Sequence, residues 1–161
     1  MKKLGIIICG LVLMMGCERN IYRFTEGSVY GTVYHVSYQS EVDYTVEIRQ
    51  EMERVNQSLS MFNKESVIAR WNRGESERVD SLFVTMYEKA REVYEATGGG
   101  FDITVAPLVN AWGFGFKNEK LPSDGKIDSL LQYVGMDKVQ LEGVRLVKLV
   151  EGVQIDASSI A

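Results

Sequence analysis

The segment from Gly98 to Gly115, GGGFDITVAPLVNAWGFG, most strongly constrains how this chain folds. Three consecutive glycines follow an amphipathic stretch, and a Phe-Asp pair, an apolar run with a proline and a Gly-Phe-Gly turn come next. A regular helix or strand tolerates such a glycine run poorly, because each glycine loses much backbone entropy and contributes no side chain. We interpret the segment as a loop that another backbone or a ligand approaches closely, with Asp102 beside the opening.

The N-terminus has the pattern of an export signal. Two lysines precede an apolar run at residues 4–15, which is too short to span a bilayer as a helix, and Gly16 and Cys17 follow it. A small residue directly before a cysteine ends the signal of a bacterial lipoprotein. We therefore predict a signal peptide at residues 1–16, lipidation at Cys17 and an exported protein anchored at the cell membrane. A plain secretory signal and a retained short anchor are the alternatives.

Composition excludes several classes of site. Both cysteines, Cys9 and Cys17, belong to the predicted signal or its cleavage point, so the remaining domain has no thiol for a disulfide, a zinc site or a nucleophile. The single histidine, His35, lies on a predicted strand with no serine motif nearby, which argues against a Ser-His-Asp site. The formal net charge of −4 argues against nucleic acid as a partner.

Hydrophobic patterning predicts an α+β domain of antiparallel strands packed against helices. We expect a tether at residues 17–27 and a strand at residues 28–40, bent at Gly31. Helical periodicity and short β-type runs then alternate with turn residues. The expected helices are residues 43–59, 65–71, 80–97 and 127–133, and the expected β-type runs are residues 138–141, 145–150 and 153–155.

The chain stops inside an Asp- and Ser-rich turn. The last β-type run leads into Asp156, and the chain ends at Ala161. Such a turn after a strand normally continues into a helix, so we expect a truncated chain that exposes core surface. A genuine short product without catalysis is the competing hypothesis.

Four short segments combine small, aromatic, hydroxyl and carboxylate residues. They are residues 30–32, residues 60–63 with 69–72, residues 98–115, and residues 156–161. Aromatic side chains stack on a flat ring, and backbone N–H groups bind phosphates. This mixture is typical of a site for a flat aromatic ligand with hydroxyls and phosphates.

At these segments the chain resembles the ApbE family, the FAD:protein FMN transferases. The family's flavin loop reads close to GGAFDVTVGPLVNLWGFG, and its early strand reads MGTTYHV where this chain has YGTVYHV. The family's STYDPDSELSRFN corresponds to SMFNKESVIARWN here, and LDLSAIAKGYAVD corresponds to IDASSIA. The resemblance covers residues 28–161 in order, and it implies the N-terminal part of a flavin transferase domain with an ApbE, T-fold-like architecture.

The resemblance also implies an activity. Family members use Mg²⁺ to transfer FMN from FAD to a Ser or Thr hydroxyl of an acceptor protein, and AMP is released. Some members instead hydrolyse FAD to FMN and AMP. The family's remaining metal ligands, an Asp and a Thr, belong to the later half of its sequence, so we expect this chain alone to be inactive. A non-catalytic lipoprotein that binds flavin or a protein partner is the third possibility.

Site residues follow from the same resemblance, position by position. The family's FAD-contacting positions correspond here to Tyr30, Ser60, Met61, Phe62, Gly100, Phe101, Asp102 and Asp156. Tyr30 replaces a Met of the family, which leaves that contact open. Ser159 matches a position whose backbone carbonyl binds magnesium. Local alternatives exist: Asp102 as a turn carboxylate, Ser159 as a helix cap, Tyr30 as a packing residue. No catalytic residue is assigned.

Overall fold

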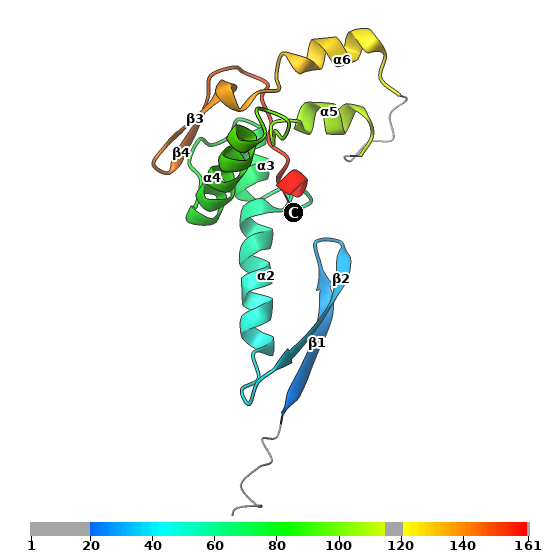
Figure 1. Ribbon diagram of the computed structural model, residues 1–161, viewed down its shortest axis with the longest axis vertical. Coiled ribbons are helices and arrows are strands. Elements are labelled where there is room, and N and C mark those ends of the chain that lie inside the picture. The colour runs from blue at the N-terminus through cyan, green and yellow to red at the C-terminus, as the bar shows by residue number, and fades with distance from the viewer. Residues whose placement is uncertain (1–19, 115–120, 161) are drawn as a thin grey trace, which may run out of the picture.

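The computed structural model describes residues 20–114 and 121–160. It has a helical head, from which helix α2 (Thr45–Leu59) extends, and a β-hairpin lies beside α2 with its turn toward the head (Figure 1). The predicted signal peptide, Cys17, Gly115 and Ala161 lie outside the described residues. Among the residues described, no helix has the length and apolar character needed to cross a membrane.

The hairpin consists of strands β1 (Tyr22–Val29) and β2 (Thr32–Gln39), which pair antiparallel in a two-stranded sheet. Tyr30 and Gly31 form the turn, with φ angles of 54° and 77°. Positive φ at both central residues matches the twist of the flanking strands, and glycine adopts it without strain.

The hairpin corrects two expectations. Residues 22–27 are part of a strand rather than of a tether, and the chain reverses at Gly31 instead of bending there. The reason is tertiary: β1 gains hydrogen-bonding partners along its whole length, from Tyr22 opposite Gln39 to Val29 opposite Thr32. Sequence patterning alone did not reveal that residues 22–29 had a partner strand.

The helices of the head are α3 (Val67–Asn72), α4 (Ser81–Ala96), α5 (Ala106–Ala111) and α6 (Asp124–Leu131). The helical periodicity predicted α3, α4 and α6, whereas the apolar residues 103–109 allowed either a helical or an extended conformation. Side chains cap the first two, since Ser66 Oγ accepts from the Ala69 amide at 3.1 Å and Asp80 Oδ1 from the Phe83 amide at 2.8 Å. Helix α6 begins at Asp124, three residues before the predicted start.

The C-terminal part has one fewer strand than expected. Strands β3 (Val139–Glu142) and β4 (Arg145–Lys148) pair antiparallel, after the short 3₁₀ helix η1 (Met136–Lys138). The third run, at residues 153–155, forms only a single parallel bridge, between Gln154 and Val105. A second 3₁₀ helix, η2 (Ala157–Ile160), follows it.

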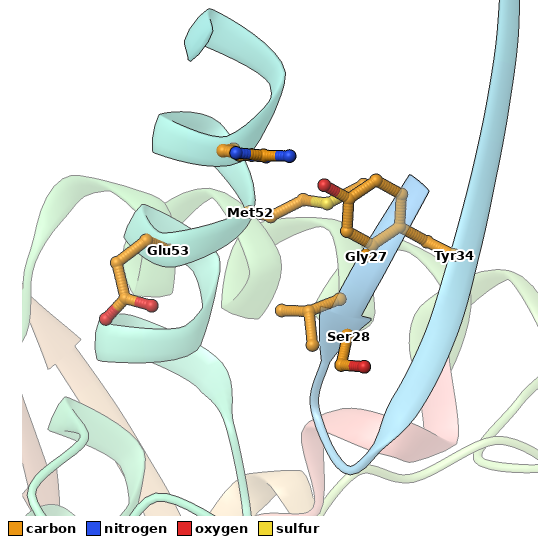
Figure 2. Close-up of a pocket in the computed structure, with 7 residues that line it drawn as sticks. Gly27, Ser28, Tyr34, Met52 and Glu53 are labelled. Carbon is orange, nitrogen blue, oxygen red and sulfur yellow. The ribbon is translucent and has the colours of Figure 1, made fainter. Parts of the chain in front are cut away.

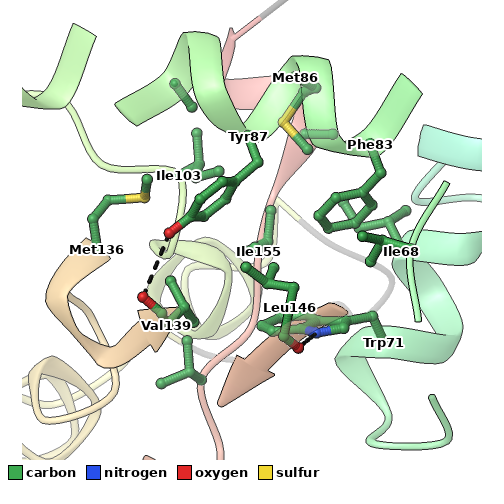
Figure 3. Packing of buried hydrophobic residues seen from close by; sticks show 14 residues of the cluster. Ile68, Trp71, Phe83, Met86, Tyr87, Ile103, Met136, Val139, Leu146 and Ile155 are labelled. Atoms are coloured by element: carbon green, nitrogen blue, oxygen red, sulfur yellow. Dashed lines mark hydrogen bonds between the residues drawn. The ribbon is translucent and has the colours of Figure 1, made fainter. Parts of the chain in front are cut away.

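The hydrophobic core lies in the head, between α3, α4 and the C-terminal segment (Figure 3). Trp71 and Phe83 have ring centroids 6.4 Å apart. Polar atoms of the buried rings are satisfied, because Trp71 Nε1 donates to the Leu146 carbonyl at 2.7 Å and Tyr87 Oη to the Val139 carbonyl at 3.4 Å. The architecture is therefore α+β, as predicted.

Candidate functional site

A cavity of about 320 Å³ lies where the hairpin turn, the end of α2 and η2 meet. We call it the turn cavity. Its lining is mostly apolar, which suits a flat aromatic ring. The lining residues are Tyr30, Val55, Leu59, Ser60, Met61, Phe62, Met86, Ala157, Ser158 and Ile160. Four predicted FAD-binding residues, from segments far apart in sequence, therefore share one cavity: Tyr30, Ser60, Met61 and Phe62.

Ser60 forms the turn that presents Met61 and Phe62 to the turn cavity. Its Oγ accepts hydrogen bonds from the amides of Phe62 and Asn63, each at 3.2 Å, and its carbonyl accepts from Ser66 Oγ at 2.8 Å. Ser60 is buried, whereas Phe62 is 67 % exposed. The hydroxyl of Ser60 thus shapes the loop, and Phe62 stays largely exposed where it lines the turn cavity.

Tyr30 anchors the hairpin turn on α2. Its Oη donates to the Met52 carbonyl at 2.7 Å. Burial, together with the negative charges of Glu53 and Glu51, raises the pKa of Tyr30, so the phenol stays protonated and remains a donor. This contact closes one wall of the turn cavity.

A second cavity, of about 420 Å³, separates the hairpin from α2 (Figure 2). Figure 2 shows Tyr34 of β2 and Met52 of α2 reaching toward each other across it. The ring of Tyr34 covers Gly27, where an added Cβ would lie 2.9 Å from the ring. None of the predicted site residues lines this cavity, so we assign it no ligand.

The first two glycines of the run end α4, as the amphipathic stretch before them predicts for Gly98. Gly98 and Gly99 end α4 in a Schellman motif, with the Gly98 amide donating to the Glu95 carbonyl at 3.2 Å and the Gly99 amide to the Tyr94 carbonyl at 2.9 Å. Their φ angles are 60° and 83°, which favour glycine. The helix end, rather than a ligand, accounts for these two glycines.

Asp102 closes the loop that follows. Its Oδ1 accepts from the amide and hydroxyl of Thr104, at 2.7 and 2.6 Å, and its Oδ2 accepts from the Met136 amide at 3.1 Å. Asp102 therefore acts as a turn carboxylate, which is the local alternative to a ligand-binding role. Gly100, Phe101 and Asp102 do not line the turn cavity, and Phe101 packs against the edge of the core. Their contacts with FAD stay a prediction.

Asp156 connects this loop to the turn cavity. Its amide donates to the Ile103 carbonyl at 2.8 Å, next to Asp102. Its Oδ1 accepts from the amide of Ser158 at 2.9 Å and from the hydroxyl of that residue, which lines the cavity. Ser159 Oγ donates to the Asp156 carbonyl at 2.7 Å. The third and fourth predicted segments therefore meet at Asp156.

A family model described as the ApbE family matches residues 30–161. The chain belongs to the ApbE family. Curated relatives named FAD:protein FMN transferase include those of Vibrio cholerae serotype O1, 28 % identical over 173 residues, and Haemophilus influenzae, 31 % identical over 182 residues. Each alignment covers 100 % of this chain and 52 % or 53 % of the relative, respectively. The chain thus spans about half the length of these ApbE proteins.

Solved ApbE structures have the same fold. The flavin transferase ApbE from Vibrio cholerae superposes with a TM-score of 0.79 at 28 % identity, over 87 % of this chain and 49 % of that one. The apo form of the Pseudomonas stutzeri flavinyl transferase ApbE gives a TM-score of 0.80 at 26 % identity, over 91 % and 52 %. These similarities confirm the fold and the family predicted from the four segments.

A magnesium site needs more oxygen ligands than the described residues of this chain bring together. Mg²⁺ requires near-octahedral oxygen coordination, so the single carbonyl predicted at Ser159 does not form a site. Within residues 20–114 and 121–160, no three His, Cys, Asp or Glu side chains are grouped to hold a metal. The described residues do not by themselves fit the ion, and the assignment of Ser159 stays a prediction.

Sequence reasoning missed several residues of the site. Val55 and Leu59 come from the apolar face of α2, and Ala157 and Ile160 come from η2. The helical periodicity marked the α2 residues as apolar, but did not indicate that they line the turn cavity. Asn72 was also missed as a site residue, although it ends the second segment. It contacts the backbone immediately before Asp156.

Proposed function

We propose that this chain is the flavin-binding part of an FAD:protein FMN transferase. The observation that carries the proposal is the turn cavity, which gathers residues 30, 60–62, 157, 158 and 160 around an apolar space. These are three of the four segments that resemble the family. The fourth, around Asp102, joins them through the hydrogen bond between Asp156 and Ile103.

The reaction transfers FMN from FAD to the acceptor protein, and FMN becomes attached through its phosphorus. A Ser or Thr hydroxyl oxygen of the acceptor protein forms a bond to the FMN phosphorus, the pyrophosphate P–O bond to AMP breaks, and the hydroxyl proton passes to a base. This chain's residues bind and orient FAD for that step. Carboxylates accept hydrogen bonds and repel phosphate, so Asp102 and Asp156 suit ribose hydroxyls or ring N–H groups rather than phosphate.

Three further features belong to the proposal. They are a requirement for Mg²⁺, held with the help of residues other than those described, the release of AMP, and an exported protein lipidated at Cys17. The resemblance of the four segments supports the first two, and the apolar run before Gly16 and Cys17 supports the third.

FAD titration of the purified chain, followed by flavin fluorescence, tests the binding function. Phe62→Ala is expected to weaken FAD binding about tenfold, because aromatic stacking contributes roughly 1–3 kcal/mol. Phe24→Ala is the matched control, since Phe24 lies in β1 and is 77 % exposed, close to the 67 % of Phe62. Equal affinity of the wild type and both variants would contradict the assignment of the turn cavity.

Product analysis separates the alternatives in a protein that contains the later half of the family's sequence. Covalent FMN on an acceptor protein, with one AMP released for each FMN attached, supports the transferase. Free FMN and AMP without an attached flavin indicate the FAD pyrophosphatase. Binding of FAD without either product indicates a non-catalytic flavin-binding lipoprotein.

A further inference from the structure

Asn72 makes an unusual pair of hydrogen bonds to the segment that carries Asp156. Its Nδ2 donates to the Ile155 carbonyl at 2.8 Å, and its Oδ1 accepts from the Ile155 amide at 2.8 Å. The two residues are 83 positions apart in sequence. One side chain thus satisfies both backbone groups of a single residue, as a neighbouring strand would.

The burial of Ile155 makes this pair consequential. Ile155 is 0 % exposed, so water cannot replace a lost partner of its backbone. The side-chain amide of Asn72 supplies a donor and an acceptor on two separate atoms, whereas aspartate lacks the donor and leucine lacks both. Asn72 is therefore well suited to satisfy the backbone of Ile155.

Asn72 is itself held in place. It is the last residue of α3, and its own carbonyl accepts from Lys148 Nζ at 3.1 Å. The preceding residue, Trp71, is buried, with its ring 4.4 Å from the same ammonium and its Nε1 bonded to the Leu146 carbonyl. A side chain on so well fixed a helix end determines where the segment opposite it lies.

The segment opposite leads directly into the turn cavity. Ile155 is bonded to Asn72, the Asp156 amide is bonded to Ile103, and η2 then places Ala157, Ser158 and Ile160 in the cavity wall. Asn72 itself does not line the cavity. Any effect that it has on a ligand there must pass through residues 155–160.

We propose that Asn72 is a positioning residue for flavin binding, which fixes residues 155–160 against the turn cavity through its two hydrogen bonds to Ile155. This inference rests on the proposed flavin function. We call these two hydrogen bonds the clamp. Without the clamp, Asp156 and η2 are anchored mainly through Ile103, so residues 155–160 sample positions that do not hold the ligand.

The test compares Asn72→Asp, Asn72→Ala and Ile68→Val in the full chain. Asn72→Asp keeps the shape and loses the donor, and Asn72→Ala loses both groups without adding a charge. Ile68→Val is the control, because Ile68 is 0 % exposed on the same helix and its truncation weakens the core without touching Ile155. Two readouts are measured: the Kd for FAD, and amide hydrogen exchange of residues 155–160 relative to α4.

Both Asn72 variants are expected to raise the Kd for FAD about tenfold and to speed exchange at residues 155–160 about tenfold relative to α4, in line with an unsatisfied buried carbonyl. Ile68→Val should leave the Kd for FAD, and the exchange rate of residues 155–160 relative to α4, within about twofold of the wild-type values. A uniform change of exchange over the whole head, or an unchanged Kd with wild-type binding intact, overturns the inference. Failure of the wild type to bind FAD instead refutes the proposed function, and with it the flavin role of Asn72.

Discussion

Replacing Asp80 by alanine should detach the beginning of α4 from the end of α2. Asp80 Oδ1 accepts two hydrogen bonds, from the Phe83 amide at 2.8 Å and from Ser58 Oγ at 2.8 Å. The first caps α4 and the second links α4 to the last turn of α2, two residues before Ser60. The turn that presents Met61 to the cavity therefore depends on this carboxylate.

The magnitude follows from the two bonds. Loss of an Asp N-cap costs about 1 kcal/mol. Ser58 is 1 % exposed, so its hydroxyl would be left without a partner at a cost of roughly 1–2 kcal/mol. We expect Asp80→Ala to lower the free energy of unfolding by about 2–3 kcal/mol. Asp80→Asn keeps an acceptor oxygen at the same place and should cost less than about 1 kcal/mol.

Urea denaturation followed by far-UV circular dichroism measures these differences, and Ser58→Ala completes a double-mutant cycle. The cycle should give a coupling of about 1 kcal/mol between Ser58 and Asp80. A loss below about 0.5 kcal/mol for Asp80→Ala, or additive effects of the two alanine changes, would refute the argument that this carboxylate joins the helices.

Three further predictions concern the helix end, a buried tyrosine and the anchor. Gly98→Ala should lower the free energy of unfolding by about 1–2 kcal/mol, because the φ angle of Gly98 is 60°. Gly125→Ala in helix α6 is the control and should be neutral or stabilising. Denaturation curves that rank the two variants the other way would contradict the Schellman assignment. Burial raises the pKa of Tyr87 above its ordinary value of 10.0, so its contribution to stability is complete below pH 10 and is lost as the pH rises through the folded-state pKa. Between pH 8 and 11, the unfolding temperature should fall less steeply in Tyr87→Phe than in the wild type. Parallel pH profiles of the two proteins would show that Tyr87 does not cause the loss of stability at high pH. Cys17→Ser should abolish lipid attachment, and persistent partitioning of that variant into the detergent phase would argue against a lipoprotein.

Local patterns account for the parts of the fold that were predicted well. The periodicity of residues 80–97 and the cap at Asp80 indicated α4 because the hydrogen bonds of a helix and of its cap join residues close in sequence. Motif identity likewise indicated the family and four residues of the turn cavity, which are Tyr30, Ser60, Met61 and Phe62. Prediction failed at residues 22–29 and 153–155, since whether a short apolar run becomes a strand depends on a distant partner.

The sequence by itself thus determined the family, the α+β class and most of the helices, because those properties depend on motif order and on neighbours three or four residues apart. Only the tertiary structure showed that Tyr30, Ser60 and Ala157 line one cavity. It also revealed Asn72 as the clamp on Ile155. These features join residues that are far apart in sequence, and the spacing of residues along the chain does not indicate which distant residues come into contact.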